Sequence, residues 1–115
     1  MKLNHLNLTV TDATETRIFL EKYFGLRGSE GGNHGFQVLF DDDHLVLTLI
    51  KGKAADVTYP ATFHIGFIQP TEERVDEINQ QLRNDGYDVE PPARLHGAWT
   101  FYFRAPGGFT IEVLC

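Results

Sequence analysis

Residues 3–26, LNHLNLTVTDATETRIFLEKYFGL, join a strand pattern directly to a helix pattern. Apolar and polar side chains alternate over residues 5–10, which is typical of a half-buried strand. Asp12 with Glu15 three residues later forms a capping box, and an apolar stripe at helical spacing follows. Gly25 suits the C-terminal end of that helix. The stretch therefore predicts one strand followed by one amphipathic helix.

The same order returns in the second half of the chain. TFHIGFI (62–68) alternates as a strand, and PTEERVDEINQQLRNDG (70–86) carries a threonine N-cap and a helical apolar stripe. Extended segments follow each helix: residues 36–40 and 44–50 after the first, and residues 87–92, 98–104 and 109–115 after the second. A shift of 59 residues lays His5 on His64, and a shift of 64 lays the strand 45–50 on 109–114 with its alternation kept. These matches predict an internal repeat.

We therefore predict an α+β fold with two βαβββ modules in one domain, residues 1–115. The modules are 1–50 and 61–115, and residues 51–60, which lack periodicity, are the linker. Each module is expected to form a small curved sheet with its helix on one face. The other face of each sheet stays open.

The net charge, the length of the apolar runs and the cysteine count argue against several classes of protein. The net charge of −6, from ten Lys plus Arg against sixteen Asp plus Glu, argues against a nucleic-acid partner. The sequence has no apolar run of membrane length and no signal-peptide pattern, so we expect no membrane partner and a cytoplasmic location. The single cysteine, Cys115, excludes an intrachain disulfide and a cysteine-only metal cluster.

Three ionisable residues fall on the open faces by their position in the alternation: His5, His64 and Glu112. Two imidazoles and one carboxylate are the ligand set of a facial triad, which suits Mn, Fe(II), Co, Ni or Zn. Each residue alone is more often a solvated surface residue. Because the three residues occupy equivalent places in a repeated pattern, together they favour a divalent metal site.

The other histidines fit loops and turns better than a site. His34 lies among glycines, His44 follows three aspartates, and His96 precedes a predicted strand. The DDDH segment (41–44) lacks the ligand spacing of a calcium loop. We interpret His34 and His96 as loop residues, and His44 as the first residue of a strand that follows a solvated turn.

Four segments carry a resemblance to a known family: LNHLNLTV, FLEKYFGL, FHIGF and FYFRAPGGFTIEVL. Together they resemble the vicinal oxygen chelate superfamily, which includes glyoxalase I, extradiol dioxygenases, fosfomycin-resistance thiol transferases and bleomycin-resistance proteins. The resemblance implies paired βαβββ modules whose sheets curl into a cup around a metal. It assigns the metal to the same three residues, His5, His64 and Glu112.

The resemblance also implies roles for further residues. Thr48 stands where glyoxalase I-like members have a fourth metal ligand, so the chain looks more like the three-ligand branches. Asn7 matches a substrate-touching position of the thiol transferases, and Tyr102 is a candidate catalytic proton donor. The substrate-binding candidates are Asn7, Thr48, Trp99, Thr100 and Arg104.

Two classes of function stay open. The first is a small metal-dependent enzyme, of the lyase, thiol-transferase or dioxygenase type, acting on a small oxygen-rich molecule chelated to a divalent ion. The alternative is a non-catalytic protein that binds a small molecule or antibiotic, as bleomycin-resistance proteins do; the acidic charge and the aromatic residues fit this reading. The resemblance further implies a homodimer whose sites are shared between chains.

Overall fold

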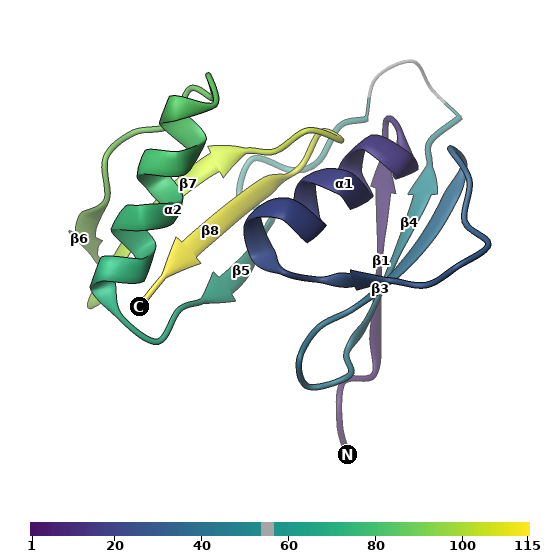
Figure 1. Ribbon diagram of the computed structural model, residues 1–115, viewed down its shortest axis with the longest axis horizontal. Coiled ribbons are helices and arrows are strands. Elements are labelled where there is room, and N and C mark those ends of the chain that lie inside the picture. The colour runs from purple at the N-terminus through teal and green to yellow at the C-terminus, as the bar shows by residue number, and fades with distance from the viewer. Residues whose placement is uncertain (54–56) are drawn as a thin grey trace. The chain divides into compact units, whose positions relative to one another are not determined.

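The computed structural model describes residues 1–53 and 57–115, and the chain divides into two compact units (Figure 1). Each unit has one helix and one four-stranded mixed sheet. The predicted α+β class and the βαβββ order of both halves are confirmed. The predicted linker, 51–60, includes residues 54–56, which lie outside the described residues.

The first unit comprises Met1–Tyr59 and Pro106–Phe109. Its sheet has the order β1-β4-β3-β2, with β1 parallel to β4. Helix α1 packs against one face of this sheet, where strand residues such as Leu8 and Leu49 are fully buried. The elements are β1 (His5–Val10), α1 (Ala13–Phe24), β2 (Arg27–Gly28), β3 (Phe36–Phe40) and β4 (Val46–Lys51).

The second unit comprises Pro60–Ala105 and Thr110–Cys115. Its sheet has the order β5-β8-β7-β6, with β5 parallel to β8, and helix α2 packs against β7 and β8. The elements are β5 (His64–Ile68), α2 (Glu72–Asn84), β6 (Ala93–Leu95), β7 (Ala98–Arg104) and β8 (Thr110–Leu114). The two units thus repeat the same connection of strands.

The pairing registers confirm the internal repeat residue by residue. His5 lies opposite Val46 in the first unit, and His64 lies opposite Thr110 in the second. The shifts of 59 and 64 residues therefore hold in both sheets, and Thr48 is the structural equivalent of Glu112.

Two predicted strands begin later than the alternation indicated. Residues 87–92 were expected to be extended, but the strand of that region is β6, Ala93–Leu95. The strand expected from His44 begins at Val46. The carboxylate of Asp41 accepts the N–H groups of Asp43 and Leu45 at 2.9 and 2.8 Å, and this turn holds His44 at a φ of 66°.

The turn Pro106–Phe109 is fixed by a glycine. Gly107 has a φ of 102°, and its carbonyl oxygen accepts the backbone N–H of Thr11 at 3.2 Å. A Cβ at this position would lie 2.6 Å from Oγ1 of Thr16, which is fully buried. Only glycine fits both the backbone angle and the space.

A tyrosine covers part of the outer edge of β1. The Tyr59 hydroxyl accepts the N–H of Thr9 at 2.8 Å and donates to the carbonyl of the same residue at 2.7 Å. Burial raises the pKa of Tyr59 above its ordinary value of 10.0, although both contacts with Thr9 oppose the rise. The phenol is therefore protonated at neutral pH and can donate this bond.

The N-cap of α1 gives a pH-dependent prediction. Asp12 Oδ1 accepts the N–H of Glu15 at 2.7 Å, and this bond lowers the pKa of Asp12 below 3.8. A lowered pKa stabilises the folded state above the unfolded-state value, and this stability is lost as the pH falls through the folded-state value. Asp12→Ala should lose about 1 kcal/mol of unfolding free energy at pH 7.

Urea denaturation from pH 7 down to pH 3 measures this loss, which should shrink as the pH falls. Asp12→Asn is the matched control, because asparagine keeps the acceptor oxygen without a titrating charge. An equal loss for Asp12→Ala at both ends of the pH range contradicts the assignment.

Candidate functional site

Two of the three predicted metal ligands meet on the open face of the second sheet. Nε2 of His64, on β5, lies 3.4 Å from Oε2 of Glu112, on β8. The His64 side chain is 40 % exposed and that of Glu112 is 13 % exposed. The pair is therefore reachable from solvent through the imidazole, while the carboxylate is largely enclosed.

Neighbouring groups orient both side chains. Nδ1 of His64 lies 3.0 Å from the carbonyl oxygen of Thr62. A carbonyl only accepts, so this contact places the proton of a neutral imidazole on Nδ1 and leaves the lone pair on Nε2. Oε1 of Glu112 accepts from the hydroxyl of Thr100 at 3.0 Å. Nε2 of His64 and Oε2 of Glu112 are thus the two donor atoms that face each other.

Tyr102 lies beside this pair. It is directly opposite Glu112 in the β7–β8 register, and its ring meets the His64 ring edge-on at 5.3 Å between centroids. A hydrogen bond to the Glu112 side chain raises the pKa of Tyr102, and burial and the carboxylate charge act in the same direction. The tyrosine predicted as a proton donor is therefore in contact with both predicted ligands.

A glycine leaves space next to the carboxylate. Gly66 of β5 lies opposite Glu112, and a Cβ there would be 3.8 Å from Oε2 of Glu112. The equivalent residue of the first unit is Asn7. A glycine inside a strand often marks close approach of a ligand. Sequence reasoning missed Gly66, although a glycine within an apolar strand pattern was a visible signal.

The first unit presents the third predicted ligand on its own open face. Nδ1 of His5 lies 3.1 Å from Oδ1 of Asn4, so its Nε2 is also left as the donor atom. Along the same face, the hydroxyl of Thr48 donates to Oδ1 of Asn7 at 2.7 Å. The N–H groups of the Asn7 amide take no part in this bond with Thr48. Asn7 is exposed and Thr48 is half-buried.

The remaining substrate-binding candidates are placed differently from one another. Arg104 is exposed on the Glu112 face. Thr100 is on that face too, but only 1 % of it is exposed, which is too little for substrate contact. Trp99 lies on the opposite face, where its indole N–H donates to Asp76 of α2 at 2.7 Å. We therefore remove Thr100 and Trp99 from the substrate-binding set.

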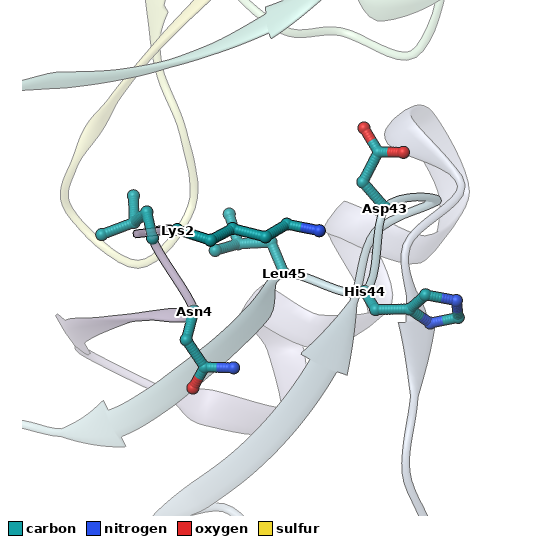
Figure 2. Close-up of a pocket in the computed structure, with 6 residues that line it drawn as sticks. Lys2, Asn4, Asp43, His44 and Leu45 are labelled. Carbon is teal, nitrogen blue, oxygen red and sulfur yellow. The ribbon is translucent and has the colours of Figure 1, made fainter.

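A hollow of about 370 Å³ lies at the end of the first sheet (Figure 2). It contains none of the predicted ligands, and in Figure 2 the imidazole of His44 points away from Lys2. The residues that line it are Lys2, Leu3, Asn4, Asp43, His44 and Leu45. One of these lining residues, Asn4, contacts the imidazole of His5 through its Oδ1.

Neither unit by itself gathers three or more His, Cys, Asp or Glu side chains in a metal-binding group, as far as the structure describes its residues. The second unit supplies a two-residue pair, and the first supplies one histidine. In the described part of the chain, both helices are too short or too polar to cross a membrane.

A model of the Glyoxalase/Bleomycin resistance protein/Dioxygenase superfamily matches residues 2–113. The chain belongs to this superfamily. The family resemblance noted in the sequence is thereby confirmed. No curated protein matches the sequence.

Solved structures of the superfamily include a possible glyoxalase from Bacillus cereus. It is 57 % identical to this chain, with a TM-score of 0.92, and the alignment covers 100 % of this chain and 99 % of that one. A lactoylglutathione lyase from Agrobacterium tumefaciens is 18 % identical (TM-score 0.77; 98 % and 92 % covered). The fosfomycin resistance protein FosX from Listeria monocytogenes is 22 % identical (TM-score 0.80; 99 % and 90 % covered). The last two share the fold alone.

Proposed function

We propose that this protein is a small metal-dependent enzyme of the superfamily, of the lyase, thiol-transferase or dioxygenase type. Its substrate is a small oxygen-rich molecule that chelates a divalent ion. The observation that carries the proposal is the His64–Glu112 pair, whose donor atoms lie 3.4 Å apart on an open sheet face. We propose His5 as the third ligand, from the same chain or from a second one.

The donor set fits a divalent ion of the Mn, Fe, Co, Ni or Zn class. Two donors that each bind one ion at about 2.1 Å are roughly 3.0 to 3.4 Å apart at octahedral to tetrahedral angles. The separation of 3.4 Å between Nε2 of His64 and Oε2 of Glu112 falls within this range. In both histidines Nδ1 contacts an oxygen acceptor, which is the usual arrangement around metal-binding imidazoles.

The other residues of the open faces would then bind and orient the substrate. A bound divalent ion supplies Lewis-acid stabilisation of negative charge on a substrate oxygen. Tyr102 can donate a hydrogen bond or a proton beside the ligand pair, and Arg104 can pair with an anionic group. The amide N–H groups of Asn7, whose oxygen is held by Thr48, can donate to a substrate oxygen.

Elemental analysis of protein purified without a histidine tag tests the proposal. We expect about one transition-metal ion per chain, its loss on dialysis against a chelator, and its return when the ion is added back. Protein that carries no metal and takes up none from added Mn²⁺, Fe²⁺, Co²⁺, Ni²⁺ or Zn²⁺ contradicts the proposal.

A second candidate is a binding protein without catalysis. The open face of the first sheet favours it, because Phe36 and Ile50 lie opposite each other there and are 43 % and 44 % exposed. The net charge of −6 suits a cationic ligand. Tight binding of a cationic aromatic antibiotic such as bleomycin, unchanged by a chelator, supports this candidate over the enzyme.

Dimerisation and a cytoplasmic location stay predictions. The superfamily resemblance supports a homodimer that shares its sites, with His5 and the His64–Glu112 pair on different chains. Sedimentation equilibrium measures the mass in solution, and a monomeric mass excludes the shared arrangement without excluding the metal.

A further inference from the structure

Thr100 is a buried polar residue whose hydroxyl contacts the candidate ligand Glu112. Only 1 % of Thr100 is exposed. Its Oγ1 lies 3.0 Å from Oε1 of Glu112 and 2.9 Å from the carbonyl oxygen of Val113. In this rotamer of Thr100 the hydroxyl reaches both acceptors. Because the hydroxyl has one proton, it donates to one of these oxygens at a time.

This contact and the hydrogen bond with Tyr102 both act on the orientation of the carboxylate, and only the Thr100 contact comes from a buried side chain. Thr100 and Glu112 are diagonal neighbours across the β7–β8 pair, since Thr100 lies opposite Leu114. Thr100 contacts Oε1, and the oxygen that remains, Oε2, is the one that lies 3.4 Å from Nε2 of His64. Without the hydroxyl, rotation about the last bond of the glutamate side chain is less restricted.

The internal repeat provides a comparison within the same chain. In the first unit the residue equivalent to Glu112 is Thr48, which is not a carboxylate. The residue equivalent to Thr100 there is Phe36, which lies opposite Ile50 as Thr100 lies opposite Leu114. Phe36 is 43 % exposed and has no hydroxyl. The threonine therefore occurs in the unit that has a carboxylate to hold.

We propose that Thr100 is a positioning residue, which sets the affinity for the divalent ion by holding Glu112 with Oε2 toward His64. This inference rests on the proposed function, because it concerns the same carboxylate. Hydrogen bonds to metal-binding side chains typically change metal affinity by about 10- to 100-fold. Removal of the Thr100 hydroxyl should weaken metal binding by such a factor.

The test is a Co²⁺ titration of the metal-free, untagged full chain, followed by the visible absorption of the bound ion. Thr100→Val should weaken Co²⁺ binding by about 10- to 100-fold and shift the absorption band, because the carboxylate orientation changes. Thr110→Val is the matched control on the same sheet face, since the structure describes no hydrogen bond between Thr110 and Glu112. It should bind Co²⁺ within about threefold of the wild type.

A second pair of variants covers the case in which Thr100→Val does not fold. Thr100→Ser and Thr100→Ala both remove the buried methyl group, and they differ only in the hydroxyl. Thr100→Ser should keep wild-type affinity within a few-fold, while Thr100→Ala should bind at least about tenfold more weakly than Thr100→Ser. This difference isolates the hydroxyl from any general effect on packing.

The outcomes separate this inference from the proposed function. Equal Co²⁺ affinities for Thr100→Val and Thr110→Val, or for Thr100→Ser and Thr100→Ala, overturn the role of Thr100 when Glu112→Gln still loses the ion. A wild-type chain that binds no Co²⁺, or a Glu112→Gln variant that binds it as the wild type does, overturns the proposed function together with this inference.

Discussion

Replacement of Glu112 by glutamine should abolish stoichiometric binding of a divalent ion. The amide keeps the shape of the side chain and can still contact Thr100, but it lacks the negative charge that a divalent ion requires of this ligand. Since loss of a supporting hydrogen bond already costs about 10- to 100-fold in affinity, loss of the ligand itself should cost more than about 100-fold. Calorimetric titration with Co²⁺ or Zn²⁺ measures this change.

Glu77→Gln is the matched control for the loss of one negative charge. Glu77 is 65 % exposed on α2 and pairs with Arg74, so its replacement should leave metal affinity unchanged. Glu112→Gln should also unfold at a temperature no lower than that of the metal-free wild type, because it removes a charge that is only 13 % exposed. Unchanged metal content in Glu112→Gln rules out the proposed ligand set.

Gly107→Ala should destabilise the fold by about 2 to 4 kcal/mol. An alanine at a φ of 102° is strained, and its Cβ would lie 2.6 Å from Oγ1 of the fully buried Thr16. Because Thr16 cannot move into solvent, the turn itself must shift, and with it the bond between the Gly107 carbonyl and Thr11. Urea denaturation of the metal-free protein measures the loss of unfolding free energy.

Gly31→Ala separates the strain of the backbone angle from the clash. Gly31 has a φ of 85°, and a Cβ there would meet no atom within 4 Å. Its replacement should therefore cost only about 1 kcal/mol. Equal losses for the two variants indicate that the contact with Thr16 contributes nothing, which contradicts the packing described for this turn.

Alternation along single strands predicted much of the candidate site. The period of two placed Glu112 and Tyr102 on one face of the second sheet, and the repeat placed His64 on the same face. The same rule places Trp99 on the other face, because it is an odd number of residues from Tyr102. The assignment of Trp99 to the substrate did not apply this rule, and its indole N–H donates to Asp76 of α2 instead.

Other features depend on contacts that alternation does not encode. Thr100 lies on the sheet face that carries Glu112, as alternation predicts. Its burial, however, depends on how neighbouring chain segments pack over it. The late start of β4 depends on Asp41, whose side chain competes with the strand ladder for the N–H groups of Asp43 and Leu45. Such local side-chain bonds change where a strand begins without altering the apolar pattern.

The contact between Tyr59 and Thr9 has a consequence for self-association. An outer strand with unpaired N–H and C=O groups is a template onto which another chain can add a strand, and such growth leads to aggregates. The phenol occupies both backbone groups of Thr9, so a foreign strand cannot continue along β1 past this point. A single side chain thereby hinders the addition of a foreign strand at the C-terminal end of β1. The N-terminal end of β1, which begins at His5, is not protected by this contact.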